Sequence, residues 1–257
     1  MILAIDVGNT NIVLGGFEGE ELRFVSRLST DRYKMPDEYA ILLKEVLALH
    51  GSTPEQFDGA VLSSVVPPLL PSLKSAVACL LHCRVLTVSP GTRTGLDIKI
   101  DDPAILGADL VCGAVGAIKR YPLPCVVVDL GTATKFSVLD SNGSFLGGPI
   151  LPGVVISLDA LSKQTAQLPH IEFEAIDHVI GTNSIDSMRA GTVYGTAGMI
   201  DGMLARIEEE LGSPVTAVMT GGLAKSIAPY CRKNVIYDEN LLLFGLKEIY
   251  NKNAKKA

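Results

Sequence analysis

The sequence has few charged residues, no long apolar run and no strongly basic segment, and each absence excludes a class of protein. Charged residues make up 19% of the 257 residues and hydrophobic residues 47%, the opposite of the balance found in disordered chains. The net charge is −6 and no basic cluster occurs before the last few residues, so we expect no nucleic-acid partner. No run of about 18 apolar residues occurs, so we expect no membrane-spanning segment.

Other absences concern targeting and motifs. No basic region precedes Asp6, so we expect no signal peptide. The five cysteines are odd in number, which favours free thiols in a reducing, cytoplasmic compartment over a disulfide framework. The Walker A and GxGxxG phosphate loops are missing, and so is the GxSxG motif of serine hydrolases.

The apolar periodicity predicts an α/β protein in two similar halves. In the first half, predicted strands cover residues 1–6, 11–17, 21–29, 59–66 and 84–88, and predicted helices cover 36–50, 69–82 and 103–120. In the second half, predicted strands cover 125–131, 134–140, 144–150 and 215–220, and predicted helices cover 154–164 and 185–211, before two further helical segments. A turn at Asn142-Gly143 is expected to join two of these strands.

The two halves share a short motif. Residues 5–11 read IDVGNTN and residues 128–134 read VDLGTAT, with the aspartate and the glycine in the same positions. Together with the matching order of elements, this repeat predicts a duplicated α/β domain with a cleft between the copies. We place the two domains at residues 1–118 and 119–257.

The first copy of the motif has the composition of a phosphate-binding hairpin. A strand ends in Asp6, Gly8 lets the backbone approach a ligand, and Asn9, Thr10 and Asn11 offer neutral donors. Asp6 is placed to hold a hydrated Mg²⁺ ion. An ordinary turn with Asx hydrogen bonds has the same pattern, but two copies favour phosphate binding because one phosphate chain can contact both.

Asp109 is a candidate general base. It lies inside the apolar stretch GADLVCGAVGA, where a carboxylate is unusual unless it faces a cleft. Phosphoryl transfer needs little beyond positioning, charge neutralisation and a group that receives the hydroxyl proton. Asp101 and Asp102, just upstream, have the simpler interpretation of helix caps.

Two glycine-rich patterns occur in the second half. The sequence TGGLA at residues 220–224 follows a predicted strand and could accept a flat ligand such as adenosine, although a plain turn has the same pattern. Glycines at 191, 195, 198 and 202 line one face of the long predicted helix. We expect that face to pack closely, either within the fold or in a dimer interface.

These motifs, in this order, resemble the type III pantothenate kinases. The resemblance rests on IDVGNTN, GAD at 107–109, VDLGTAT, GGPILPG at 147–153 and TGGLA, and it covers nearly the whole chain. It implies two ribonuclease-H-like domains of the actin, sugar kinase and Hsp70 superfamily, and a homodimer. It also implies ATP-dependent phosphorylation of pantothenate, the first step of coenzyme A biosynthesis, with Mg²⁺ and a monovalent cation, either K⁺ or NH₄⁺.

The resemblance assigns residues by position. Asp109 would accept the proton, and Asp129 would coordinate the monovalent cation. ATP would contact Asp6, Val7, Gly8, Asn9, Thr10, Asn11, Ile12, Val13 and Thr132. Pantothenate would contact Ile100, Gly107, Ala108, Asp109, Leu110 and Ser184.

The sequence departs from the family pattern mainly where pantothenate would bind. Leu110 replaces an arginine, Gly113 an asparagine, and Ile100 a tyrosine, while Lys135 stands where the second phosphate motif has threonine. Losing an arginine removes up to five donors and a fixed charge. Two alternatives therefore stay open beside a pantothenate kinase: a kinase for another small alcohol, and a non-catalytic nucleotide-binding regulator of the same fold. The retained Asp109 argues against the regulator.

Overall fold

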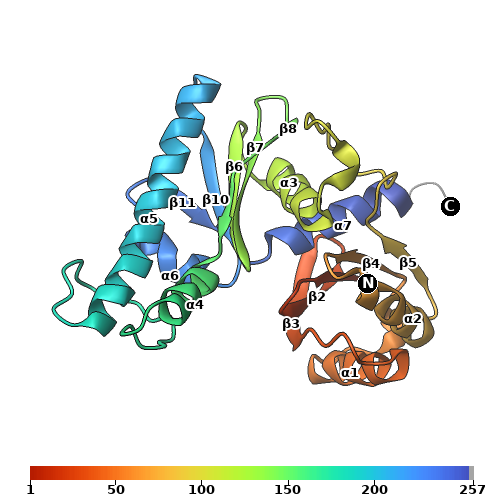
Figure 1. Ribbon diagram of the computed structural model, residues 1–257. Helices are drawn as coiled ribbons and strands as arrows, with labels where there is room; N and C mark the ends of the chain where they lie inside the picture. The colour runs from red at the N-terminus through yellow and green to blue at the C-terminus, as the bar shows by residue number, and fades with distance from the viewer. Residues whose placement is uncertain (255–257) are drawn as a thin grey trace. The chain divides into compact units, whose positions relative to one another are not determined.

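The computed structural model describes residues 1–254, which form two compact units (Figure 1). Unit 1 comprises residues 1–96, 102–119 and 241–254, and unit 2 comprises residues 97–101 and 120–240. Each unit has its own β-sheet and its own apolar core.

The sheet of unit 1 has the strand order β3-β2-β1-β4-β5. Its strands are β1 (Ile2–Val7), β2 (Asn11–Glu18), β3 (Glu21–Ser29), β4 (Gly59–Ser64) and β5 (Arg84–Thr87). β2 is antiparallel to both of its neighbours, β1 and β3, whereas β1, β4 and β5 run parallel. The central strand β1 is an almost continuous apolar run, as expected for a strand covered on both faces.

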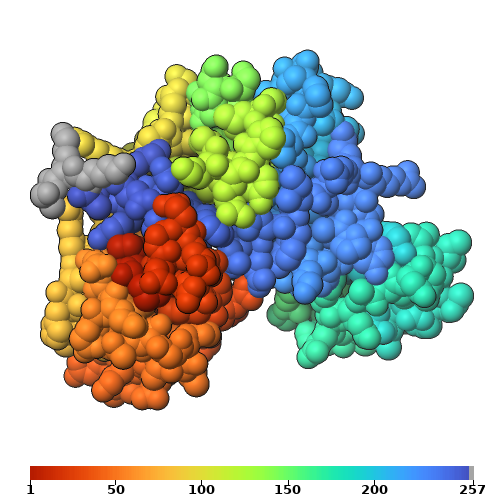
Figure 2. All heavy atoms as spheres, turned by 180° about the vertical axis from the view of Figure 1, so that it is seen from behind, coloured from red at the N-terminus to blue at the C-terminus, as the bar shows by residue number. Residues whose placement is uncertain are grey.

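Helices cover both faces of this sheet. These helices are α1 (Pro36–Leu49), α2 (Leu70–Leu81) and α7 (Leu241–Ala254), and α3 (Ala108–Arg120) packs against α7. The apolar sides of α1 and α2 form the larger core with Leu3 and Ile5 of β1. On the opposite face α7 packs against β1, β2 and β4, and Phe17 meets Phe244 edge to face at 5.4 Å. Figure 2 shows α7, in dark blue, beside the red N-terminal strands.

The sheet of unit 2 repeats this arrangement in the order β11-β10-β6-β7-β8, with β9 beside β7. Its strands are β6 (Cys125–Leu130), β7 (Ala133–Leu139), β8 (Phe145–Gly147), β9 (Ile150–Pro152), β10 (Thr216–Thr220) and β11 (Val235–Tyr237). In both sheets the first strand is central, with an antiparallel hairpin on one side and parallel strands on the other. The expected duplication of a ribonuclease-H-like domain is therefore confirmed.

The helices of unit 2 are α4 (Val154–Gln164), α5 (Ser184–Leu211) and α6 (Ala224–Ile227). The helix α5 begins after Asn183, whose side chain accepts a hydrogen bond from the Asp186 amide, and ends at Gly212 in the left-handed conformation. One side of α5, including Ile200 and Leu204, packs on the sheet. A Cβ atom added at Gly191, Gly195 or Gly198 would meet no heavy atom within 4 Å in the described chain, so these glycines have no close neighbour in the fold.

Two predicted elements are divided in the structure. The helix expected over 103–120 is a short 3₁₀ turn at Pro103–Ile105 followed by α3, because Leu106 is extended between them. Asp102 caps that 3₁₀ turn by accepting a hydrogen bond from the Ala104 amide. The strand expected over 144–150 is split into β8 and β9 at Gly147 and Gly148, which both have positive φ.

The C-terminal helix differs from the domain assignment made from the sequence, which placed all of 119–257 in one domain. In the structure α7 belongs to unit 1. The physical reason is that its buried side chains, such as Leu243 and Leu246, cover the face of the first sheet that α1 and α2 leave open. Residues 255–257 of the expected second domain lie outside the described residues.

Candidate active site

The first motif forms a tight turn between β1 and β2. The Gly8 amide donates to the Asn11 carbonyl at 2.9 Å, and Asn9, Thr10 and Asn11 are exposed. Thr30, which directly follows β3, stabilises this turn through two hydrogen bonds. Its hydroxyl donates to the Gly8 carbonyl at 2.7 Å, and its amide donates to the Thr10 carbonyl at 2.9 Å. The turn is thus a fixed loop with exposed polar side chains.

The aliphatic side chains of this motif face the core of unit 1 and not the exposed turn. The side chains of Val7 and Ile12 are fully buried in the core of unit 1, and Val13 is half-buried opposite Asp6. Any contact of Val7 or Ile12 with a ligand would therefore be made by main-chain atoms.

Asp6 lies at the carboxyl end of β1 and is paired in register with Ser63 of β4. The Ser63 hydroxyl is fully buried and donates a hydrogen bond to Oδ1 of Asp6. Hydrogen bonds of this kind orient a carboxylate and stabilise its charged form. The carboxylate therefore has a defined direction at the same sheet edge as the turn.

Asp109 is in the first turn of α3 and is half-buried. Its Oδ1 accepts a hydrogen bond from the Leu110 amide at 2.9 Å, as suits a carboxylate at the positive end of a helix dipole. A Cβ atom at residue 107 would lie 2.5 Å from the same oxygen. Gly107 is thus the residue that leaves room for this carboxylate.

The buried Cys112 thiol is influenced by the charges of both Asp6 and Asp109. Burial raises the pKa of the Cys112 thiol well above its usual range, and the negative charges of Asp6 and Asp109 raise it further. The thiol is therefore neutral and unreactive. Asp6 of β1 and Asp109 of α3 thus both lie within electrostatic reach of this buried side chain in unit 1.

The second motif forms the corresponding turn between β6 and β7 in unit 2. The Gly131 amide donates to the Ala133 carbonyl at 3.2 Å, and Gly131 and Thr132 are exposed. Asp129, at the end of β6, occupies the place that Asp6 has in β1. Both turns follow an aspartate and are closed by a glycine amide, but the second turn is shorter than the first, because Gly8 bonds to Asn11 and Gly131 to Ala133.

Asp129 forms an ion pair with Lys135. Its Oδ2 lies 2.8 Å from the Lys135 ammonium, and each side chain is only 18% exposed. A Cβ atom at Gly221, which has a φ of +96°, would lie 2.7 Å from the other carboxylate oxygen. The carboxylate is thus bordered by the ammonium on one side and by the TGG turn on the other.

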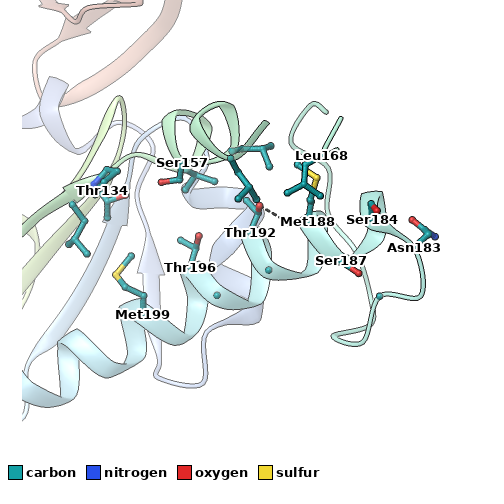
Figure 3. A pocket seen from close by; sticks show the side chains of 18 of the residues that line it. Thr134, Ser157, Leu168, Asn183, Ser184, Ser187, Met188, Thr192, Thr196 and Met199 are labelled. Carbon is teal, nitrogen blue, oxygen red and sulfur yellow. Dashed lines mark hydrogen bonds between the residues drawn. The ribbon is translucent and has the colours of Figure 1, made fainter. Parts of the chain in front are cut away.

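A cavity of about 870 Å³ lies within unit 2 between α4 and α5 (Figure 3). Its lining is mostly apolar, with hydroxyls from Thr134, Ser157, Thr192 and Thr196. The Thr192 hydroxyl donates to the Met188 carbonyl at 2.7 Å, whereas the buried Thr134 hydroxyl has no hydrogen-bond partner among the described residues. Ser184 is exposed and lines the same cavity, at the start of α5.

Comparisons with known proteins identify the family. The profile of the family described as type III pantothenate kinase matches residues 2–206. A type III pantothenate kinase of Myxococcus xanthus is 44% identical over 253 residues, covering 98% of this chain and 99% of the relative. The chain belongs to the type III pantothenate kinase family.

Solved structures support the fold of this type III pantothenate kinase family member. A Baf family protein from Campylobacter jejuni has a TM-score of 0.62 at 20% identity, covering 98% of this chain and 99% of that one. An activator of 2-hydroxyisocaproyl-CoA dehydratase from Clostridium difficile, solved with bound ADPNP, has a TM-score of 0.60 at 14% identity, covering 100% and 98%. These likenesses bear on the fold alone.

The cation implied by the resemblance to type III pantothenate kinases can be tested against the residues at Asp129. The Lys135 ammonium already lies in contact with this carboxylate, at 2.8 Å. A second cation about 4 Å from the ammonium would be repelled by roughly 4 kcal/mol at an effective dielectric constant near 20. A free monovalent cation therefore does not fit at Asp129 beside Lys135.

The departures from the type III pantothenate kinase pattern occupy defined places. Leu110 is half-buried and Gly113 is buried, both on α3 in unit 1. Ile100 is half-buried in unit 2, and a Cβ atom at Gly147 would lie 3.5 Å from it. Its segment pairs with β8, since the Lys99 amide donates to the Phe145 carbonyl at 2.8 Å. The structure thus places these substituted positions in different units.

Two residues that support the turn and Asp6 were missed from the sequence. Ser63 orients Asp6, and Thr30 fixes the Gly8 turn. The polar end of the strand 59–64 was an available signal for Ser63, because polar residues at the carboxyl ends of neighbouring parallel strands meet at one sheet edge. Thr30 offered no local signal.

Within residues 1–254, no three His, Cys, Asp or Glu side chains are grouped so that they could hold a metal ion. None of the described helices combines the length and the apolar character that crossing a membrane requires.

Proposed function

We propose that this protein transfers the γ-phosphoryl group of ATP to the primary hydroxyl of pantothenate, the first step of coenzyme A biosynthesis. Membership of the type III pantothenate kinase family supports the activity. The observation that carries the assignment of residues is the Asp6 carboxylate, which the buried Ser63 hydroxyl orients beside the exposed turn that follows β1.

The ATP phosphates bind the exposed amides and side chains of the turn that follows Asp6. The contacting residues are Asp6, Val7, Gly8, Asn9, Thr10, Asn11, Ile12 and Val13 in unit 1, and Thr132 in unit 2. Val7 and Ile12 contribute main-chain atoms only, since their side chains are buried. The fixed geometry of the turn supports this role, because preorganised donors need no rearrangement when charge develops.

The carboxylate of Asp6 fits a hydrated Mg²⁺, held through water. Mg²⁺ is commonly bound by one or two carboxylates together with substrate phosphates, so a single oriented aspartate is a sufficient donor set. When bound, the ion offsets negative charge on the phosphates. Ser63 keeps the carboxylate pointing in one direction.

Asp109 acts as the general base. The hydroxyl oxygen of pantothenate bonds to the γ-phosphorus while the bond from that phosphorus to the β,γ-bridging oxygen breaks, and ADP leaves. Asp109 receives the hydroxyl proton, a role for which a carboxylate in the first turn of a helix is accessible.

Pantothenate contacts Gly107, Ala108, Asp109 and Leu110 around the start of α3, together with Ile100 and Ser184. Gly107 supports this assignment by leaving room for the Asp109 carboxylate. Leu110 supplies an apolar contact where the family has an arginine. We expect these residues to bind pantothenate with fewer polar contacts than the family pattern provides.

The protein is a homodimer in the cytoplasm. Gly198 of α5 supports dimerisation, because it is exposed and nothing lies within 4 Å of its Cβ position in the described chain, whereas Gly191 and Gly195 line the cavity between α4 and α5. The five free cysteines support a reducing compartment. Light scattering coupled to gel filtration measures the oligomeric state.

The test of the activity is ADP release from Mg-ATP with and without pantothenate. Pantothenate-dependent ADP release, with 4′-phosphopantothenate detected by mass spectrometry, supports the proposal. ATP binding without pantothenate-dependent turnover contradicts it. The substitutions at Ile100, Leu110 and Gly113 then favour another acceptor, and a screen of small alcohols follows.

A further inference from the structure

We propose that the ammonium group of Lys135 takes the place of a free monovalent cation, so that nucleotide binding and turnover in this protein do not depend on potassium or ammonium ions. The inference concerns the nucleotide site and rests on the proposed function for its activity readout. Its binding readouts are independent of the phosphate acceptor.

The ion pair is set by the register of a β-hairpin. Asp129 of β6 and Lys135 of β7 are direct cross-strand partners, so their side chains leave the same face of the sheet. The Lys135 Nζ atom lies 2.8 Å from Oδ2 of Asp129. The ammonium is therefore held at a fixed place and does not sample the solvent as a surface lysine does.

The same ion pair lies beside the turns assigned to the nucleotide. Cβ atoms built at Gly221 and Gly131 would lie 2.7 and 3.5 Å from Oδ1 of Asp129. Gly131 begins the second phosphate turn, and Gly221 is in the TGG turn after β10. The positive charge of Lys135 thus lies where it can offset the negative charge of the ATP phosphates.

A tethered ammonium can replace a dissolved ion for two physical reasons. It is an ammonium group like NH₄⁺, with one compact positive charge and three of the four N–H donors, but it is always present because the chain supplies it. It also repels a second cation from the same carboxylate. The partial burial of the pair, with both side chains 18% exposed, limits screening by salt.

A purely structural ion pair would behave differently. In that case the loss of Lys135 would lower the melting temperature but would create no response to potassium. The decisive observation is therefore whether a variant without Lys135 gains a response to potassium. We use Lys135→Thr because the shorter side chain leaves room for a potassium ion beside the Asp129 carboxylate.

The first experiment uses the unaltered protein. Binding of a non-hydrolysable ATP analogue with Mg²⁺ is measured by calorimetry, and pantothenate-dependent turnover by ADP release, in KCl, NH₄Cl and choline chloride at equal ionic strength. We expect affinity and turnover to differ by less than about twofold among the three salts, because general screening is constant. Activation by K⁺ or NH₄⁺ of about tenfold or more over choline would overturn the proposal.

The second experiment compares Lys135→Thr with Lys233→Thr. Lys233 also forms a partly buried ion pair in unit 2, with Glu208. It serves as the control because neither residue belongs to a phosphate turn. For Lys135→Thr in choline we expect analogue affinity to fall by at least about tenfold, and to recover when K⁺ or NH₄⁺ is added. Lys233→Thr should show no difference between salts. A Lys135→Thr protein that binds the analogue equally in all salts would contradict the proposal.

The melting temperature gives a third readout that needs no acceptor. In the presence of the ATP analogue, KCl should raise the melting temperature of Lys135→Thr above its value in choline chloride, and should not do so for the unaltered protein. If turnover with pantothenate is absent in every salt, the proposed function fails, while the binding and melting data still decide the role of Lys135. If turnover occurs but needs potassium, only the inference about Lys135 fails.

Discussion

The Ser63 hydroxyl donates a hydrogen bond to Oδ1 of Asp6 across the parallel strands β4 and β1, and Ser63 itself is fully buried. A buried side chain thus orients the carboxylate that we propose to hold hydrated Mg²⁺. We expect Ser63→Ala to raise the Mg²⁺ concentration for half-maximal activity about tenfold, since hydrogen bonds to charged groups contribute roughly 1.5–3 kcal/mol.

A Mg²⁺ titration of ADP release at saturating ATP measures this effect. The matched control is Ser144→Ala, which also removes a serine–aspartate hydrogen bond, the one of 3.0 Å to Asp97 in unit 2. The Mg²⁺ dependence of the control should not change. An unchanged Mg²⁺ dependence in Ser63→Ala would show that Asp6 does not depend on this contact.

Replacement of the proposed base separates chemistry from binding. We expect Asp109→Asn to lower turnover by about 10²–10⁴-fold and to leave ATP binding nearly intact, because the amide keeps the shape but cannot accept the proton. Rapid-quench kinetics and calorimetric ATP binding measure the two quantities. Asp37→Asn is the control, as Asp37 is also an acid in the first turn of a helix. Near-normal turnover in Asp109→Asn would refute the assignment.

The crossing of α3 and α7 depends on two glycines. A Cβ atom at Gly245 would lie 1.8 Å from the Cys112 carbonyl oxygen, and one at Gly116 would lie 2.4 Å from the Leu241 carbonyl oxygen. We expect Gly245→Ala to lower the free energy of unfolding by at least about 1–3 kcal/mol, because the new methyl group would meet the Cys112 carbonyl, a backbone group that cannot rotate away. Urea unfolding measures the loss.

Gly198→Ala is the matched comparison, since it places the same methyl group on a helix where nothing lies within 4 Å. In an isolated chain it should stabilise α5 by about 0.5–1 kcal/mol. If the glycine face of α5 forms the dimer interface, the same change should instead weaken dimerisation. Equal unfolding free energies for the two alanine variants would contradict the steric argument.

The buried cysteines predict a loss of stability in alkali. Burial raises the pKa of the Cys125 thiol from 9.0 to about 12. Below pH 9 the thiol is protonated in both states, and its contribution is fully present. Above pH 9 the unfolded chain releases this proton while the folded chain keeps it, so the free energy of unfolding falls as the pH rises towards 12.

Urea unfolding between pH 8 and 11 measures this slope, to which one thiol contributes at most about 1.4 kcal/mol per pH unit. We expect Cys125→Ala to reduce the slope. The control Cys79→Ala removes an exposed thiol and should leave the slope unchanged. A slope identical in the Cys125→Ala protein would show that this thiol ionises equally in both states.

Much of the local structure follows from the sequence by itself. The start of α1 at Pro36, the end of α5 before Gly212 and the turn at Asn142-Gly143 all depend on neighbouring residues, through capping, backbone conformation and side-chain periodicity. The repeated aspartate-glycine motif also indicated the duplicated fold, because each copy follows a strand and opens a hairpin in its own half of the chain.

Only the tertiary structure decided which distant residues meet. The placement of α7 in unit 1 depends on an apolar sheet face made by strands from the first part of the chain, and the Ser63–Asp6 contact depends on the parallel register of β1 and β4. The Lys135–Asp129 pair likewise depends on hairpin register. Periodicity indicates which side of an element is buried, but the choice of partner results from packing over the whole unit. That choice determined which charged side chains lie beside each aspartate-glycine turn.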